Sequence, residues 1–298
     1  MVTQMNKKIE EFSQLIEENL YKYFNTYFDE YKILFDSMEY SVKNGGKRVR
    51  PLLTMLFCDA CGGDPLKAVQ LAVAVEYIHT YSLIHDDLPC MDDDDFRRGK
   101  PSNHKVYGEA MALLAGDGLL TAAFERIATW SRAGLIDSDV AINAISELSA
   151  YAGSRGMIGG QVIDIQNEDN KDIKLETLMM LDNLKTGALI EAACSLGCIV
   201  ARADEDKIQA AKEFASNIGL AFQIKDDILD VTSSFEKLGK AIGSDIENGK
   251  TTYVTLLGVE ECQKLVDKLT DDALKALDAF ENNEALKEYA LYLAKREC

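Results

Sequence analysis

Residues 71–84 read LAVAVEYIHTYSLI, and residues 85–92 continue with HDDLPCMD. The first stretch carries apolar side chains nearly all round a helix, so we expect a central helix that is buried on every side. Pro89 lacks a backbone donor, which predicts that this helix ends or bends just before it, near residue 87. The stretch therefore predicts a helical core with a cluster of aspartates at the end of its central helix.

The rest of the chain has the composition of a helical protein. Of its 298 residues 47% are hydrophobic and 8% aromatic, and the four prolines all lie in the first 101 residues. No strand-like alternation and no linker rich in Pro, Gly or Ser divides the chain, so we predict a single all-α domain over residues 1–298. The expected helices cover about 8–40, 51–61, 65–87, 106–131, 137–167, 174–201, 205–231, 251–266 and 270–295.

Charge and cysteine usage exclude several classes of partner. The net charge of −18 argues against nucleic acid and anionic membrane surfaces. No stretch of about 18 uncharged apolar residues occurs, so we expect no membrane-spanning helix. Seven scattered cysteines suit a reducing compartment, which predicts a cytoplasmic protein. We expect Cys58 and Cys61 to be buried thiols rather than a redox or zinc motif.

The first group of carboxylates, Asp86, Asp87 and Asp92, lies where the central helix is expected to end. The helix dipole disfavours negative charge at a C-terminus, so an acidic cluster there indicates a cation. Asp ligands without His or Cys at ligand spacing favour a hard ion, Mg²⁺ or else Mn²⁺. The alternative is a solvated acidic loop, which is the usual state of a charge run.

A second acidic group follows 140 residues later in the stretch FQIKDDILD (222–230). Asp226 and Asp230 are four residues apart, so they share one helix face, with Asp227 beside them. Taken alone, this group is explained equally well by a metal site and by the acidic outer face of a surface helix. Mg²⁺ usually combines few carboxylates with substrate phosphates, so two such groups together indicate a phosphorylated substrate between them.

Clusters of cations support an anionic substrate. Residues 43–50, KNGGKRVR, hold four cations in a strongly acidic chain, and Arg97 and Arg98 directly follow the first aspartates. Arginine binds phosphate through two parallel hydrogen bonds. Lys185 interrupts an apolar run, and Lys225, Lys240 and Lys250 surround the second acidic group. An ordinary surface lysine is a reasonable explanation for Lys225 and a weaker one for Lys185.

Small residues recur at Ala152, Gly156 and Gly160 in AGSRGMIGGQVIDI (152–165). Glycine costs a helix about 1 kcal/mol, so a close helix crossing or a ligand is expected to compensate. Gln161 and Asp164 follow one turn later and are expected to point into the same cavity.

Taken together, these motifs resemble the short-chain trans-prenyl diphosphate synthases of the bacterial farnesyl/geranylgeranyl type. The resemblance covers about residues 40–255. It is carried, in family order, by GGKRVRP (45–51), IHDDLPCMDDDDFRRGKPSNH (84–104), GMIGGQ (156–161), KTG (185–187), FQIKDDILD (222–230), LGK (238–240) and ENGKTTY (247–253). It implies the isoprenoid synthase fold, with helices around a deep apolar pocket, and usually a homodimer.

The resemblance also implies roles for individual residues. About three Mg²⁺ ions per site, with Mn²⁺ possible, would be held by Asp86, Asp87, Asp92 and Asp226, with Asp227 and Asp230 as water-mediated partners. The allylic diphosphate would be bound by Arg97, Lys185 and Lys240, with Lys250 also in the substrate site. Isopentenyl diphosphate would be bound by Lys47, Arg50, His79 and Arg98. Thr186 and Gln223 would lie along the developing allylic cation. Without the resemblance, His79 is better explained as a core histidine.

The reaction so implied is Mg²⁺-assisted ionisation of an allylic diphosphate, attack by isopentenyl diphosphate and loss of a proton, with Asp86, Asp92, Lys185, Thr186 and Gln223 as the catalytic residues. An aromatic residue five positions before Asp86, here Tyr81, resembles the farnesyl enzymes, so we expect a C15 product, with Tyr81 and Ser82 setting chain length. The alternatives are a C20 geranylgeranyl product and a non-catalytic synthase subunit. A terpene cyclase and a calcium-buffering protein fit the motifs less well.

Overall fold

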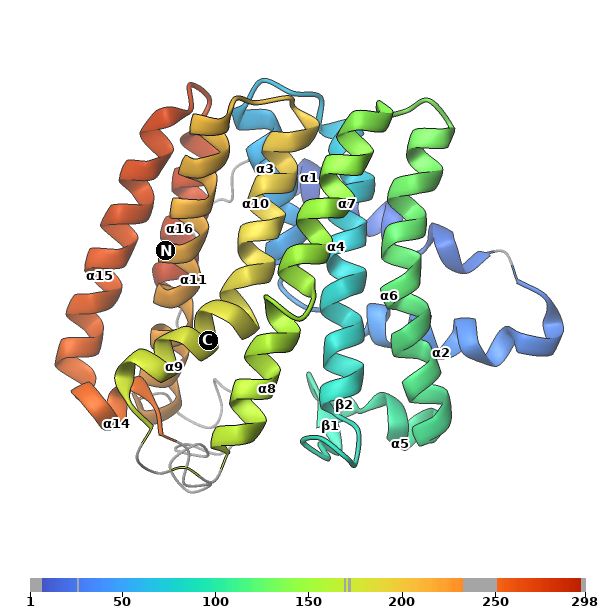
Figure 1. Cartoon of the computed structure of the whole chain (residues 1–298), viewed down its shortest axis with the longest axis horizontal. Coiled ribbons are helices and arrows are strands. Elements are labelled where there is room, and N and C mark those ends of the chain that lie inside the picture. The colour runs from blue at the N-terminus through green and yellow to red at the C-terminus, as the bar shows by residue number, and fades with distance from the viewer. Residues whose placement is uncertain (1–6, 26, 169, 171–172, 233–250, 296–298) are drawn as a thin grey trace.

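The computed structural model describes residues 7–25, 27–168, 170, 173–232 and 251–295, and most of them are helical (Figure 1). This confirms the all-α class. In chain order the helices are α1 (Lys7–Leu20), α2 (Lys32–Lys43), α3 (Val49–Ala60), α4 (Pro65–Asp86), α5 (Asn103–Tyr107), α6 (Glu109–Arg132), α7 (Ser138–Ala152), α8 (Met157–Asn167), α9 (Leu175–Asp182), α10 (Ala188–Val200), α11 (Glu205–Thr232), α14 (Tyr253–Leu257), α15 (Val259–Ala276) and α16 (Glu284–Lys295). Short 3-10 turns lie at η1 (Lys22–Asn25), η2 (Asp29–Tyr31) and η4 (Leu277–Ala279), and a π-helical turn at η3 (Asn183–Gly187).

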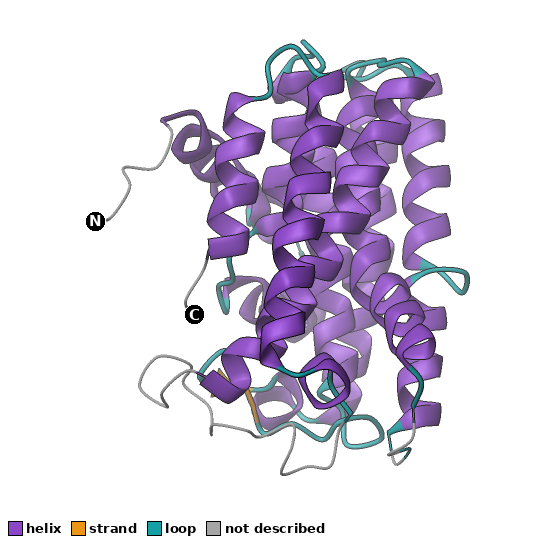
Figure 2. Ribbon diagram, turned by 90° about the vertical axis from the view of Figure 1, so that its left-hand side faces the viewer, coloured by secondary structure: helices purple, strands orange, loops and turns teal. Residues whose placement is uncertain are grey.

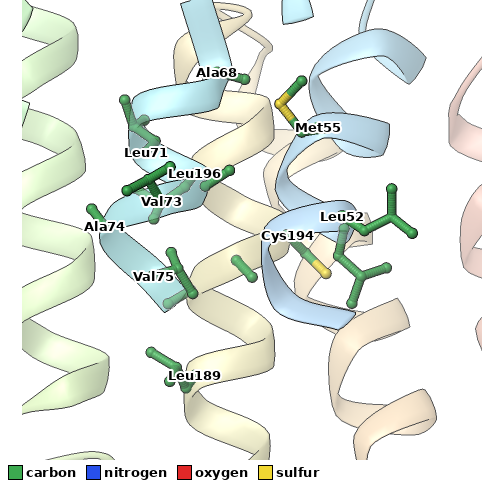
Figure 3. Packing of buried hydrophobic residues seen from close by; sticks show 14 of the residues in the cluster. Leu52, Met55, Ala68, Leu71, Val73, Ala74, Val75, Leu189, Cys194 and Leu196 are labelled. Atoms are coloured by element: carbon green, nitrogen blue, oxygen red, sulfur yellow. The ribbon is translucent and has the colours of Figure 1, made fainter. Parts of the chain in front are cut away.

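Helix α4 is the central helix that its sequence predicts. Asp64 caps it by accepting a 3.0 Å hydrogen bond from the Leu66 amide, and Pro65 occupies its first position, where a missing donor costs nothing. The helix packs against α3, α6 and α10, which explains why it is apolar on every face. Figure 3 shows Leu71, Val73 and Val75 of α4 among the buried apolar side chains where α3, α4 and α10 lie side by side. Helix α4 ends at Asp86, as the position of Pro89 predicts.

The core continues from α4 into α3 and α10, which approach each other closely. A Cβ atom at Gly197 would lie 2.4 Å from the Thr54 carbonyl oxygen, so only glycine permits this approach. A second, smaller group of buried residues joins α11 to α15, including Ile224, Ile228 and Val266. The two clusters fix the ends of α3, α4 and α11 that carry the charged motifs.

Several expected helices are interrupted. The segment expected as one helix over 8–40 is α1 and α2, separated by η1 and η2, because Tyr23 and Phe24 turn inward and pack on Tyr77. The segment expected over 137–167 breaks after α7, where Gly156 donates a 3.0 Å hydrogen bond to Gly153. The sequence prediction of uninterrupted helices was wrong at both places.

A short hairpin was also missed. Strands β1 (Phe96–Arg97) and β2 (Lys100–Pro101) pair antiparallel across Arg98 and Gly99. Both turn residues have positive φ, 54° and 76°, which is the backbone of a type I′ turn. Two-residue strands carry too little alternation to be seen in a sequence, but this turn fixes where Arg97 and Arg98 lie.

The long helices run roughly side by side, and the charged motifs gather at one end of the bundle. There β1, β2, α5, α8, α9 and α14 lie together in Figure 1, and Figure 2 shows strand at the same end of the bundle. One segment, Leu175–Val200, has the length and apolar composition of a membrane-spanning helix. Its most apolar window is 67% buried inside the fold, as a core helix is.

Candidate active site

The first acidic cluster forms where α4 ends. The Asp92 amide donates a 2.9 Å hydrogen bond to the Asp86 carbonyl oxygen, which folds the chain back after Pro89. Burial and repulsion from Asp92 and Asp87 outweigh Lys185 and Arg97, and raise the pKa of Asp86 to about 6. A bound cation would relieve this repulsion, so the cluster has the chemistry of a Mg²⁺ site.

Asp87 is held differently from its neighbour. Its side chain is buried and accepts a 2.8 Å hydrogen bond from Arg97 Nε and a second bond from Arg97 Nη2. Arg97 Nη2 also donates to Asp94 at 3.0 Å. Neither Asp87 nor Arg97 lines the two large cavities described below, so the structure pairs these two expected ligands with each other.

A polar cavity of about 250 Å³ lies beside Asp92. Lys185 lines it and donates a 2.5 Å hydrogen bond to Asp164 of α8, and Asp164 is the main reason that the pKa of Lys185 is raised despite burial. Gly160 allows this contact, since a Cβ atom there would lie 2.2 Å from the Lys185 amide nitrogen. The small-residue pattern therefore does mark a close crossing, although Gly156 lies at a helix break.

The Lys185–Thr186 pair sits in the π-helical turn η3 between α9 and α10. Such turns carry an extra residue, which bulges the backbone and often marks a functional site. Both side chains line the polar cavity, together with Gln223 of α11. The structure thus brings three of the expected catalytic residues together.

Asp182, which the sequence analysis missed, lies in the same cavity. Burial raises the pKa of its carboxyl group to about 6, while contacts with Tyr253 and Gln223 oppose that rise. Tyr253 is buried at the start of α14, and its amide donates a 2.7 Å hydrogen bond to Asp227. A lone Asp in an apolar helix has no spacing partner, so nothing in the sequence pattern singled it out.

The second acidic cluster contributes unevenly. Asp227 lines the polar cavity, whereas Asp226 is exposed and Asp230 is buried on the core side of α11. Asp226 and Asp230 lie four residues apart on α11, but they differ in burial, and Asp227 is the aspartate of this group that lines the polar cavity. The described residues contain no group of three or more His, Cys, Asp or Glu side chains already arranged around a metal position.

The expected isopentenyl diphosphate residues form a cationic cluster. Arg98 Nη2 lies 3.4 Å from His79 Nε2, and burial, with the charges of Arg50 and Arg98, lowers the pKa of His79 well below its usual value. Burial and Arg98 lower the pKa of Arg50 to about 10, and within the described structure its buried Nε has no hydrogen-bond partner. Lys47 lies exposed at the edge of this cluster. Mutually repelling cations of this kind favour an anion.

An apolar cavity of about 540 Å³ extends from the cationic cluster between α4, α6 and α8. Tyr81 and Ser82 both line it, and the Tyr81 ring packs edge-on against His85 at 5.6 Å. Lys185 and Thr186 line this cavity as well as the polar one, so the two cavities meet there. Gln161 lines the apolar cavity and Asp164 lines the polar one, so the expectation that both point into the same cavity was wrong.

Two expected substrate residues, Lys240 and Lys250, lie outside the described residues. The other expected site residues lie at the same end of the bundle, from four separate parts of the chain. The long separations explain why no single stretch of sequence reveals the site.

Solved structures share this architecture. The geranylgeranyl pyrophosphate synthetase from Pyrococcus horikoshii Ot3 superposes with a TM-score of 0.88 at 30% identity, over 97% of this chain and 98% of that one. An FPP/GFPP synthase from Zymomonas mobilis gives 0.84 at 36% identity, over 96% and 97%. The fold is therefore the isoprenoid synthase fold.

The family follows from sequence. A model described as polyprenyl synthetase matches residues 31–292, so the chain belongs to the polyprenyl synthetase family, whose members are prenyltransferases. Geranylgeranyl pyrophosphate synthase of Capsicum annuum, a chloroplastic protein, is 46% identical over 89% of this chain and 72% of its own length. Geranylgeranyl diphosphate synthase of Cyanophora paradoxa is 46% identical over 84% and 82%.

Proposed function

We propose that this prenyltransferase condenses isopentenyl diphosphate with allylic diphosphates and releases geranylgeranyl diphosphate as its main product. One observation carries the proposal: the polar cavity and the apolar cavity meet at Lys185 and Thr186. A diphosphate in the first cavity and its hydrocarbon tail in the second would share that junction. A charged head joined to a long apolar tail is the chemistry of a prenyl diphosphate.

Ionisation of the allylic diphosphate is the step that the polar cavity serves. Asp86, Asp92 and Asp227 would hold Mg²⁺, which when bound would supply positive charge to the leaving pyrophosphate. Lys185 would add a fixed positive charge, oriented by Asp164 at 2.5 Å. Lys185 also lines the apolar cavity, so its charge would act in a poorly solvated site. Electrostatic attraction to the diphosphate is stronger there than in water.

Condensation would follow at the same junction. The cationic cluster of Arg50, His79 and Arg98 would hold isopentenyl diphosphate with its double bond toward the allylic carbon. Thr186 and Gln223 would lie along the developing cation with their side-chain oxygens. The apolar wall excludes water that would otherwise quench the cation. The released pyrophosphate would accept the proton, so no covalent enzyme nucleophile is needed.

Chain length is where the proposal departs from the C15 expectation. Relatives near 46% identity are named geranylgeranyl synthases, which favours the C20 alternative. A cavity of about 540 Å³ is within the range that holds drug-sized apolar ligands. Farnesyl diphosphate remains the second candidate because the bulky Tyr81 lies in the cavity wall and narrows it.

Product analysis tests the proposal. The protein is incubated with isopentenyl diphosphate, Mg²⁺ and dimethylallyl, geranyl or farnesyl diphosphate in turn, and the products are dephosphorylated and sized by gas chromatography. Extension of farnesyl diphosphate to C20 supports the first candidate, and accumulation of C15 with no use of farnesyl diphosphate supports the second. Absence of condensation with every primer would contradict the enzyme assignment itself.

We also propose that the enzyme works as a homodimer. Apolar side chains stay exposed on helices α6 and α7 in the monomer, among them Leu114 and Ile142. Large apolar side chains that group together on a surface commonly mark a protein interface. Light scattering on the purified protein should give about twice the 33.0 kDa chain mass.

A further inference from the structure

The loop between α2 and α3 has an unusual backbone. Gly45, Gly46 and Arg48 have φ angles of 82°, 131° and 47°. A non-glycine residue with positive φ is uncommon, and surrounding contacts must hold it there. The same short loop carries Lys47 and leads into Arg50 at the start of α3. Its conformation therefore determines where these two cations lie.

Arg48 is the residue that holds the loop from the inside. Its buried guanidinium donates from Nη1 to Glu76 at 2.7 Å, from Nε to Glu17 at 2.8 Å and from Nη2 to the Val42 carbonyl oxygen at 2.8 Å. Burial alone would lower the pKa of Arg48, but Glu76 and Glu17 outweigh it and raise that pKa. Glu76 is itself buried in α4, so the pair is shielded from solvent.

Arg98 holds the same loop from the other side. The Gly45 carbonyl oxygen accepts hydrogen bonds from both arginines, from Arg98 Nη1 and from Arg48 Nη1 at 3.3 Å. A Cβ atom at Gly46 would lie 2.5 Å from Arg98 Nη1, so glycine is needed for this contact. The buried Arg48 network is thus one bond away from a cation of the isopentenyl diphosphate cluster.

We propose that Arg48, with Glu76 and Glu17, positions the Gly45–Lys47 loop so that the cationic cluster can bind isopentenyl diphosphate. Arg48 is a positioning residue, because its guanidinium is hydrogen-bonded within the protein and it does not line the polar or the apolar cavity. The assignment rests on the proposed function, which supplies the ligand of the cluster. It also gives helix α1 a role, since Glu17 links that helix to the site.

Glu17→Gln is the variant that tests the positioning role. Glu17 is 44% exposed, so its loss leaves the buried Arg48–Glu76 pair in place and the fold intact. Replacing the carboxylate that accepts from Arg48 by a neutral amide weakens this hydrogen bond, and should raise the KM for isopentenyl diphosphate about three- to tenfold. The KM for the allylic diphosphate and kcat should stay within about twofold of the wild type. Arg48→Lys, which keeps the charge but loses the planar fork, should raise the same KM further.

Lys8→Met is the matched control. Lys8 lies on the same helix and donates a 2.7 Å hydrogen bond to Asp59 of α3, but its contact is remote from the loop. It weakens the attachment of α1 without touching Arg48, so every kinetic constant should match the wild type. A rise in the isopentenyl KM in Lys8→Met equal to that in Glu17→Gln would overturn the proposal, because general loosening of α1 would then explain both.

Two further results would also count against it. An unchanged isopentenyl KM in Glu17→Gln and Arg48→Lys, or an equal rise in both substrates' KM values, would show that the network does not position this subsite. Failure of the wild-type enzyme to condense any primer would remove the proposed function and this assignment with it. That failure is seen in the wild type alone, so the two cases are distinguishable.

Discussion

Arg97 Nε lies 2.8 Å from Asp87 Oδ1, so one of the expected diphosphate ligands is paired with one of the expected metal ligands. Asp87 is almost fully buried, whereas Arg97 is 30% exposed. The pair neutralises a carboxylate at the end of α4, where the helix dipole disfavours it. The Asp87–Arg97 pair therefore has a structural role in the metal-free protein.

Replacing Arg97 by Gln should destabilise the metal-free protein. The change leaves the buried Asp87 carboxylate without its cation, which should lower the free energy of unfolding by about 3 kcal/mol. Urea denaturation measures the loss. Lys105→Gln, which breaks an exposed ion pair with Asp95 in the same segment, is the control and should leave the denaturation midpoint unchanged. Equal midpoints for all three proteins would contradict the structural role.

Truncation of Tyr81 to Ala should lengthen the product. The ring occupies part of the apolar cavity wall, so removing it opens space for further isoprene units. Product sizing with geranyl diphosphate as primer measures the shift. Tyr81→Phe removes only a hydroxyl group that has no hydrogen-bond partner among the described residues, and should leave chain length unchanged. The same product length from Tyr81→Ala and the wild type would exclude Tyr81 from this role.

Lys185→Met should lower kcat by about 10² to 10³, the usual cost of removing one charge that stabilises a transition state. The KM for isopentenyl diphosphate should change little, since that substrate is assigned to the other cluster. Single-turnover kinetics at saturating substrate measures the effect. Asp164→Asn keeps the lysine and loses only its orienting partner, so its kcat should fall by at most about tenfold. Similar losses in both variants would contradict a separate role for the lysine.

Asp182 should make stability depend on pH. Its folded-state pKa is raised from 3.8 to about 6, so the native protein binds more protons than the unfolded chain between these values. The stabilising contribution is therefore complete below pH 3.8 and is lost as pH rises through 6. Asp182→Asn should be more stable than the wild type by roughly 1–2 kcal/mol at pH 7.5, with a smaller difference at pH 5.

Thermal and urea unfolding of the metal-free protein at both pH values checks this expectation. Glu176→Gln on the exposed side of α9 is the control, and it should follow the wild type at each pH. A stability difference for Asp182→Asn that does not change with pH would rule out the raised pKa as its cause.

The sequence predicts the helical class, the burial of α4 and its end before Pro89, because these depend on local pattern and on one missing donor. It also predicts that Lys185, Thr186 and Gln223 meet, through the family resemblance. It did not predict the turn between α1 and α2, where Tyr23 and Phe24 leave helical geometry to pack on a residue far along the chain. Tertiary packing, not local preference, decides that turn.

The misplaced site residues have a similar cause. The Asp87–Arg97 pair and the contacts of Asp182 depend on how η3, α11 and the β1–β2 turn are placed in space. The spacing of Asp226 and Asp230 gives their common face but not which neighbour faces the cavity. Arg48 looked like one of four similar cations, and only its burial separates it from Lys47.

Lys185 and Thr186 line both cavities, so a diphosphate head group bound beside them would always occupy the same position. Every hydrocarbon tail would then extend into the apolar cavity from the same junction, and the far wall of that cavity would limit its length. The number of carbon atoms in the product would depend on the distance between this junction and the far wall, which the surrounding helices fix. Enzymes with the same chemistry would then differ in product length through changes in the far wall of the apolar cavity, while the junction of the two cavities stays the same.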